Sequence, residues 1–200
     1  MKRSVLATIG ALSMFVALGC AKPPQDAINA AQAELDKARG QAETWAPTEL
    51  KAADEAMSAA QAEINAQNEK WLKNYDKATE LLNSAKDNAV KASEAAVTNK
   101  EQAKKDAEAA LGAADTAMQT AAADLKVAPV TKDSKADLEL FKTDLATLQS
   151  TLDAAKASFG SEDYKKALDS ANSVKDKATS IATQLEEAKK KIASRTTKKK

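Results

Sequence analysis

The sequence of 200 residues contains no histidine, one cysteine, five glycines and four prolines, and its aromatic residues are two tryptophans, two tyrosines and three phenylalanines. Without histidine, the chain lacks an imidazole for acid–base catalysis or for a Ser-His-Asp triad. A single cysteine excludes an internal disulfide and a cysteine-clustered zinc site. The scattered glycines form no phosphate-binding loop of the G-x-G-x-x-G or G-K-[ST] type. We therefore expect no catalytic residues, no metal site and no enzyme activity.

The abundant residues are alanine, lysine, glutamate, aspartate, glutamine and leucine, which together favour helices over strands. Lysine and arginine number 30 against 29 aspartates and glutamates, so the formal net charge is only +1. Acidic residues often precede lysines by four positions, as in Asp87 and Lys91 or Glu101 and Lys105. This order is typical of exposed helix faces, so we interpret the carboxylates as surface residues rather than as a catalytic or metal site.

The first twenty residues have the layout of an export signal. Lys2 and Arg3 provide a positive start, and a mostly apolar run of about fourteen residues follows over positions 5–18, too short for a stable membrane-spanning helix. Small residues and then the single cysteine, Cys20, come after this run. One interpretation is an ordinary cleaved signal that leaves a thiol at the mature start.

The sequence VALGC at positions 16–20 resembles the lipobox of bacterial lipoproteins. In that family the cysteine receives a diacylglycerol, the signal is removed and the new amino group is acylated. The resemblance implies that residues 1–19 are cleaved and that Cys20 carries a covalent lipid, with no other cofactor. By the same resemblance, Ala21 in place of an aspartate implies sorting to the outer membrane, on its periplasmic face.

Alanines and larger apolar residues recur at alternating steps of three and four, which is the heptad spacing of packed helices. Proline is tolerated in the first turn of a helix, and the residue before a proline avoids helical angles. Pro24 therefore favours a helix start, whereas Ala46-Pro47 and Ala128-Pro129 favour breaks. The pattern predicts five helices, which end near Trp45, Trp71, Val127, Phe159 and Ile192, the third being continuous through Asn99.

The helical pattern occurs twice, because a Tyr-x-x-Ala sequence opens a helix at Tyr75 and again at Tyr164. The third helix of the first unit continues into the second unit, a connection similar to that of spectrin-like tandem bundles. The predicted fold is all-α, with two tandem antiparallel three-helix bundles that share one long helix in an elongated rod. The predicted segments are a signal peptide (1–19), a tether (20–24), the first bundle (25–98), the second bundle (99–192) and a basic disordered tail (193–200).

The two predicted bundles differ in what they bury. The first is lined mainly by alanines, each of which contributes less than about 1 kcal/mol, against about 1.5–3 kcal/mol for a buried leucine or phenylalanine. We predict that Trp45, Trp71 and Tyr75 plug its ends and contribute much of its stability, with a ligand-stacking platform as the alternative. The second bundle, which carries residues such as Phe141 and Leu145, is predicted to be the more stable.

Basic residues crowd the C-terminal end, namely Lys189, Lys190, Lys191, Arg195, Lys198, Lys199 and Lys200. A solvated tail is the simplest interpretation, and contact with an anionic envelope polymer is the alternative. The chain also resembles murein lipoproteins, in which the terminal lysine is joined to peptidoglycan. This resemblance implies a peptidoglycan contact at Lys198, Lys199 and Lys200, with Lys200 as the position of a covalent link. The Ala-Pro-centred repeat is also similar to alanine-rich lipoproteins with a domain of unknown function, which implies no activity.

These patterns predict a lipid-anchored envelope lipoprotein that acts as a spacer or scaffold and contacts peptidoglycan through its basic end. The alternative is an accessory module that binds an envelope protein or associates with a second copy of itself, since narrow alanine-rich stripes suit helix pairing. Nucleic acid is not an expected partner, because aromatic residues do not alternate with the basic ones.

Overall fold

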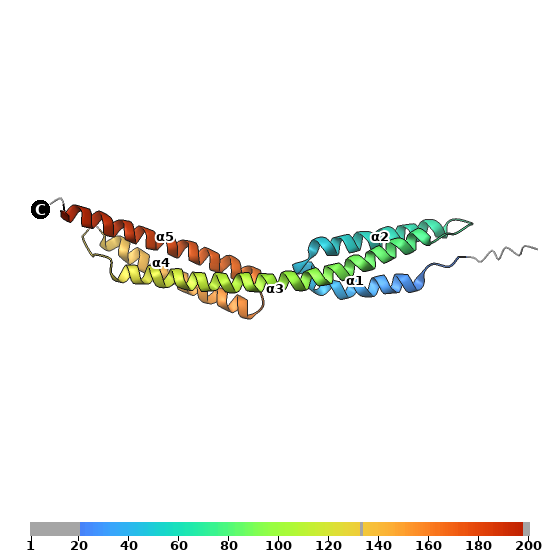
Figure 1. Cartoon of the computed structure of the whole chain (residues 1–200), viewed down its shortest axis with the longest axis horizontal. Helices are drawn as coiled ribbons and strands as arrows, with labels where there is room; N and C mark the ends of the chain where they lie inside the picture. Colours follow the sequence, from blue (N-terminus) through green and yellow to red (C-terminus); the bar gives the residue numbers. More distant parts are fainter. Residues whose placement is uncertain (1–20, 133, 198–200) are drawn as a thin grey trace, which may run out of the picture. The chain divides into compact units, whose positions relative to one another are not determined.

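The computed structural model describes residues 21–132 and 134–197, and this part of the chain is all-helical, without strands. Its helices, labelled in Figure 1, are α1 (Gln25–Trp45), α2 (Pro47–Asn68), α3 (Asp76–Lys126), α4 (Lys135–Gly160) and α5 (Tyr164–Thr197). The all-α class predicted from the composition is therefore confirmed. Cys20 and Lys198–Lys200 lie outside the described residues.

The helices break at both predicted Ala-Pro positions. α1 ends at Trp45, and α2 begins with Pro47 as its first residue. Proline is tolerated at this position because the backbone N–H that it lacks would have no partner within the helix. α3 remains helical through Asn99, as the absence of a strong breaker predicts. At the second corner α3 ends at Lys126, close to the predicted end at Val127, and α4 begins at Lys135, so Pro129 lies between the two helices.

The chain forms two compact units. The described part of unit 1 comprises residues 21–40 and Thr48–Ala92, and unit 2 comprises Gln41–Pro47 and residues 93–197. The sequence placed the division after residue 98 and assigned the corner between α1 and α2 to the first bundle. In the structure this corner, which includes Trp45, groups with unit 2.

The core of unit 1 is built from small side chains on three helices. Its members are Ala31 from α1, Ala60 and Ile64 from α2, Tyr75 at the start of α3, and Ala78, Leu82 and Ala85 from α3. The alanines in this cluster are at most 1% exposed. Because an alanine extends only one methyl group from the backbone, these helices pack closely while burying little apolar area per residue.

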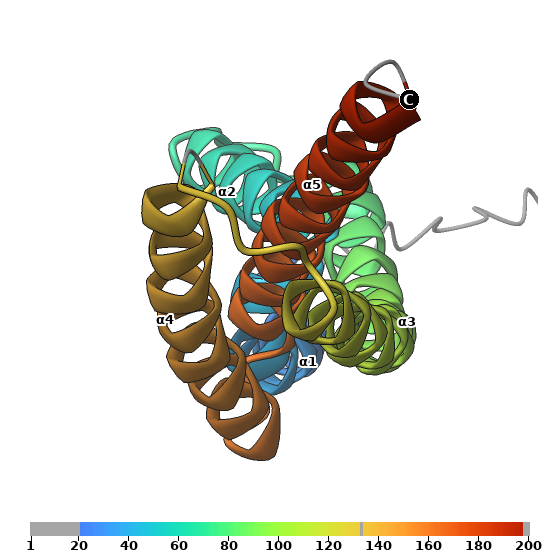
Figure 2. The ribbon, with the colours of Figure 1, turned by 90° about the vertical axis from the view of Figure 1, so that its left-hand side faces the viewer.

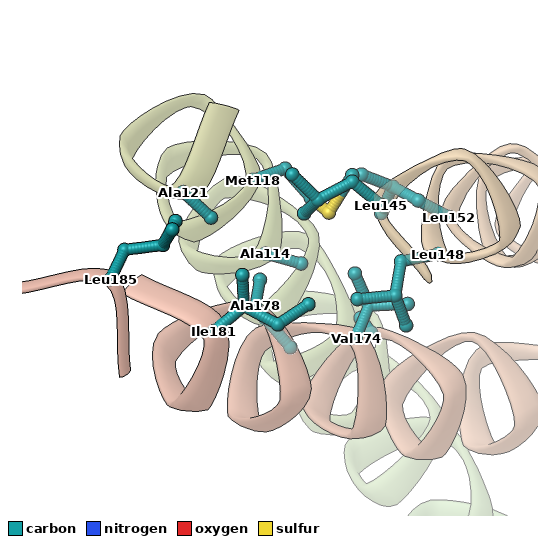
Figure 3. Packing of buried hydrophobic residues seen from close by; sticks show 12 residues of the cluster. Ala114, Met118, Ala121, Leu145, Leu148, Leu152, Val174, Ala178, Ile181 and Leu185 are labelled. Carbon is teal, nitrogen blue, oxygen red and sulfur yellow. The ribbon is translucent and has the colours of Figure 1, made fainter. Parts of the chain in front are cut away.

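The core of unit 2 contains larger side chains. It is formed by Ala110, Ala114, Met118 and Ala121 of α3, by Leu145, Leu148 and Leu152 of α4, and by Ala171, Val174, Ala178, Ile181 and Leu185 of α5. Figure 3 shows these side chains directed from the three helices toward a common centre, and Figure 2 views the same helices end-on. Leu152 and Leu185 are both completely buried.

The aromatic plug predicted for the first unit is wrong for Trp71 and for Trp45, which packs in a cluster of unit 2, whereas Tyr75 is buried as predicted. α2 ends at Asn68, a turn earlier than predicted, so Trp71 leaves the heptad pattern. Its side chain is 103% exposed, whereas that of Tyr75 is only 6% exposed and belongs to the core. The early end is stabilised by contacts in the loop between α2 and α3, in which the Asn74 N–H donates to the side chain of Gln67.

The turn between α4 and α5 is a Schellman motif without glycine at its left-handed position. The Asp163 N–H donates to the Ser158 carbonyl over 2.9 Å, and the Glu162 N–H donates to the Phe159 carbonyl over 3.0 Å. Glu162 has φ 64°, a conformation that costs an L-residue about 1–2 kcal/mol. The Asp163 carboxylate then caps α5 by accepting the Lys166 N–H over 3.3 Å.

The C-terminal helix is longer than predicted. α5 continues to Thr197, five residues beyond the predicted end of the second bundle at residue 192. The prediction of a disordered tail that begins at residue 193 is therefore wrong for residues 193–197, which are helical. The run of lysines at 189–191 does not end the helix, and Ile192 and Ala193, which follow it, are also helical.

Candidate functional site

Residues 21–24 follow directly after the predicted lipidation position. Ala21 is exposed and lies outside any helix, and residues 21–24 lead directly into α1 at Gln25. The Gln25 N–H donates to the Pro23 carbonyl over 2.8 Å, and the Ile28 N–H donates to the Pro24 carbonyl over 3.0 Å. A group attached to Cys20 would therefore be joined to the folded part of unit 1 by these few residues.

The basic end of α5 is partly neutralised by acidic neighbours. The Lys189 ammonium lies 2.8 Å from the Asp124 carboxylate of α3 and 3.0 Å from the Glu186 carboxylate. These hydrogen bonds, the one from Asp124 first, raise the pKa of Lys189 despite its partial burial. Lys189 thus fastens α5 to α3, whereas the neighbouring Lys190 and Lys191 are exposed.

An aromatic cluster occupies the end of unit 2 where α4 turns into α5. The ring centroids of Phe159 and Tyr164 lie 5.2 Å apart, and those of Trp45 and Tyr164 lie 6.2 Å apart. Both separations fall in the range of favourable aromatic pairs. Ala107 and Ala167, both fully buried, complete this cluster on the side of α3 and α5.

Polar contacts fix the indole of Trp45 in this cluster from several directions. The Lys165 ammonium lies 4.9 Å from the centre of the indole and donates to the Thr44 carbonyl over 2.6 Å. The Asn99 side-chain amide donates to the Trp45 carbonyl over 2.7 Å. Because the ring is already packed against Tyr164 and Lys165, we assign it a structural role and not that of a ligand platform.

A charged pair lies beside the aromatic cluster. The Lys100 ammonium of α3 is 2.6 Å from the carboxylate of Glu162, the residue with positive φ. The hydrogen bond from Lys100 lowers the pKa of Glu162, and the same bond raises the pKa of Lys100. Both side chains remain accessible to solvent, since that of Lys100 is 31% exposed and that of Glu162 is 63% exposed. The pair therefore fixes the α4–α5 turn and does not form a buried reactive centre.

A shallow groove runs between α4 and α5. Its apolar lining includes Phe141, Leu148 and Ile181, and Leu140 at its edge is 57% exposed. Asp144 and Lys177 provide polar lining on opposite helices. This surface suits an apolar helix or peptide better than a small substrate, because no cluster of catalytic groups lies in it.

Within residues 21–132 and 134–197, no group of acidic or sulfur-bearing side chains could hold a metal ion. No helix in the same described ranges is long and apolar enough to cross a membrane. No family model, curated protein or solved structure matches the chain.

One exposed feature was missed by the sequence reasoning. Trp71 was assigned to a buried helix face, but in the structure its side chain is 103% exposed, and the neighbouring Leu72 is 75% exposed. The signal that could have identified them is local, since lysines at positions 70 and 73 flank the pair on both sides. Apolar residues enclosed by lysines are unusual on a buried helix face.

Proposed function

We propose that the chain is a lipid-anchored envelope lipoprotein that acts as a spacer or scaffold on the periplasmic face of the outer membrane. The observation that carries this proposal is the position of the VALGC sequence. It ends at Cys20, next to the exposed Ala21 and only a short tether away from α1. A lipid on Cys20 would therefore hold the base of unit 1 at the bilayer, without an intervening domain.

Acylation of Cys20 is tested directly by mass spectrometry of the N-terminal peptide from the membrane fraction. The expected peptide begins at Cys20, lacks residues 1–19 and carries the added acyl mass. Cys20→Ser should abolish the lipid and prevent signal removal at this site. A peptide with an unmodified thiol at its start would contradict the lipoprotein assignment and would support an ordinary cleaved signal.

A scaffold role requires that the two compact units be joined by a stiff element. We propose that they are tandem three-helix bundles, since α1, α2 and α3 share one core, α3, α4 and α5 share another, and α3 belongs to both. A spacer requires an elongated particle, which small-angle X-ray scattering of the detergent-solubilised protein tests. A compact particle would contradict the spacer role.

Contact with peptidoglycan is proposed for the basic C-terminal end, through Lys198, Lys199 and Lys200. The test is sedimentation with purified peptidoglycan at increasing salt, in which three lysine-to-glutamine substitutions at 198–200 should weaken binding. Lys189 must be kept, because its loss would also remove the contact with Asp124 that joins α5 to α3. Unchanged binding by the triple variant would contradict the contact, and a cross-link lost with Lys200 alone would support covalent attachment.

The alternative function, a module that pairs with an envelope protein or with itself, is favoured by the groove between α4 and α5. Leu140 is more than half exposed at its edge, while Phe141 is half-buried within it. Sedimentation equilibrium of the solubilised protein distinguishes a monomer from an oligomer. If the groove forms the interface, Leu140→Ser should shift the protein toward the monomer, while Val97→Ser, on an exposed surface outside the groove, should leave the oligomeric state unchanged.

A further inference from the structure

The loop that joins α2 to α3, here called the α2–α3 loop (residues 69–75), exposes its two largest apolar side chains in adjacent positions. Trp71 is 103% exposed and Leu72 is 75% exposed, while Tyr75 at the end of the loop is buried. Tryptophan buries more apolar area than almost any other side chain when it is covered. A fully exposed tryptophan beside an exposed leucine therefore marks a surface that is suited to contact with another phase or molecule.

Trp71 and Leu72 are exposed although hydrogen bonds fix both ends of the α2–α3 loop. Gln67, which is only 7% exposed, donates to the Glu63 carboxylate over 2.7 Å and accepts the Asn74 N–H over 3.2 Å. The Tyr75 hydroxyl donates to the Asn68 side chain over 2.6 Å. These bonds fasten both ends of the α2–α3 loop, so Trp71 and Leu72 are presented outward by a defined backbone.

The internal repeat shows what a covered version of this corner looks like. The heptad positions of the second predicted helix recur 88 residues later in the fourth (159 − 71 = 88), so Phe159 corresponds to Trp71, and Tyr164 corresponds to Tyr75 at an offset of 89 residues (164 − 75 = 89). Phe159 is half-buried against Tyr164, and Trp45 packs on the same tyrosine from the α1–α2 corner. In unit 1 the tyrosine is buried in the same way, but the preceding aromatic residue has no such cover. Within the described part of unit 1, Trp71 is left fully exposed.

Residues 21–24, which follow the proposed lipid anchor, lie beside the α2–α3 loop. Ala21, Lys22 and Pro24 line one groove together with Leu72, Asn74 and Tyr75, so residues 21–24 and the α2–α3 loop lie at the same end of unit 1 (Figure 1). Cys20 directly precedes Ala21, and consecutive Cα atoms are about 3.8 Å apart. A lipid on Cys20 would therefore enter the bilayer next to the loop.

We propose that the α2–α3 loop is a second membrane contact, which inserts Trp71 and Leu72 into the interfacial layer of the bilayer that holds the lipid anchor. This inference depends on the proposed anchor at Cys20. Tryptophan favours the headgroup region, where its ring is buried and its N–H stays hydrated. Lys22, Lys70 and Lys73 lie at the same end and suit anionic headgroups, partly offset by Glu69 and Asp76.

A second contact changes what the anchor does. Acyl chains on one residue hold the protein at the membrane but allow unit 1 to turn freely about its tether. A loop seated beside the anchor fixes the orientation of α1 and α2 with respect to the bilayer, as two-signal membrane attachment does elsewhere. The specific occupant of the exposed surface is thus a phospholipid bilayer that contains anionic headgroups.

The test uses the lipidated full-length protein reconstituted in vesicles of phosphatidylethanolamine and phosphatidylglycerol with brominated acyl chains. Since Trp45 and Trp71 are the two tryptophans of the chain, Trp45→Phe leaves Trp71 as the sole reporter, and Trp71→Phe leaves Trp45 as the matched control. Bromine should lower Trp71 emission about two-fold, because the indole sits near the acyl boundary, and should leave Trp45 emission unchanged. The double substitution Lys70→Gln with Lys73→Gln should reduce the quenching of Trp71. The reduction should be larger in these vesicles than in matched vesicles without phosphatidylglycerol.

The outcomes separate the loop from the anchor. An acylated Cys20 with unquenched Trp71 overturns the membrane contact and leaves the anchor intact. An unmodified Cys20 overturns the anchor, and the loop is then tested by adding the same protein to preformed brominated vesicles, where absence of quenching overturns the loop contact as well. Trp71 that is unquenched in vesicles but shielded from acrylamide in isolated envelopes overturns the lipid contact in favour of a protein partner.

Discussion

The ring centroids of Trp45 and Tyr164 lie 6.2 Å apart, so the corner between α1 and α2 packs against the first residue of α5. Lys165 adds a cation at 4.9 Å from the centre of the same indole. This contact within unit 2 joins residues that are remote in the sequence. It explains why Gln41–Pro47 belongs to unit 2, although α1 and α2 pack mainly within unit 1.

The two tryptophans therefore should respond differently to truncation. Trp45→Ala removes a half-buried ring and should lower the free energy of unfolding by about 2 kcal/mol. Trp71→Ala, at a fully exposed position, should change it by less than about 0.5 kcal/mol. Urea denaturation followed by far-UV circular dichroism measures both, and an equal loss in the two variants would contradict the structure.

The sequence predicted the helices well because their cause is local. The three-four spacing of alanines and the Ala-Pro break at Pro47 act within a few residues, and α1, α3 and α5 begin close to where these patterns place them. The continuity of α3 through Asn99 was predictable for the same reason, because no breaker interrupts it.

The environment of the aromatic residues was not predictable, because it depends on bonds formed across loops. The heptad count places Trp71 on the buried face of a continuing helix. The structure ends α2 at Asn68, where the Gln67 side chain accepts the Asn74 N–H of the loop and the Tyr75 hydroxyl donates to the Asn68 side chain. Likewise, nothing in the local sequence of Trp45 indicates that its ring packs against Tyr164. The proposed lipidation at Cys20 stays a prediction.

The leucine core of unit 2 should be sensitive to truncation at its centre. Leu152 is completely buried among α3, α4 and α5, so Leu152→Ala should lower the free energy of unfolding by about 2–5 kcal/mol. Leu140→Ala is the matched control on the same helix, since Leu140 is 57% exposed and its truncation should cost less than about 0.5 kcal/mol. Thermal denaturation of the two variants in parallel checks the difference.

The alanine core of unit 1 should resist enlargement. Ala85 of α3 is only 1% exposed and packs in the cluster with Ala31 and Ile64. Ala85→Leu has to displace neighbouring helices and should cost about 1–3 kcal/mol. Ala59→Leu, on the exposed face of α2, should be close to neutral because both residues are good helix formers. A neutral Ala85→Leu would show that the close packing is not required.

Two glycines within helices offer stabilising substitutions. A methyl group added at Gly40 in α1 or at Gly112 in α3 would meet no atom within 4 Å. Alanine restricts the unfolded chain more than glycine and favours the helix, so each substitution should raise the free energy of unfolding by about 0.5–1 kcal/mol. A drop in the melting temperature of Gly112→Ala would contradict the open space around this position.

The pair of Lys100 and Glu162 predicts how stability depends on pH. The pKa of Glu162 is lowered from 4.5 in the folded state, so its contribution is complete above that pH and is lost as the pH falls through the lowered value. The pKa of Lys100 is raised from 10.5, so its contribution is complete below that pH and is lost as the pH rises through the raised value. The pair thus stabilises the α4–α5 turn across the neutral range.

Glu162→Gln keeps the backbone strain at φ 64° while removing the charge, and should therefore be less stable than the wild type at neutral pH. The difference should shrink below pH 4.5, where the wild-type carboxylate is progressively protonated. It should also shrink with added salt, because both groups are exposed enough to be screened. A double-mutant cycle measures the coupling between the two residues. It compares the denaturation of the wild type, Glu162→Gln, Lys100→Gln and the double variant from neutral pH to below pH 4.5. A difference that persists unchanged into acid would show that the ion pair is not its source.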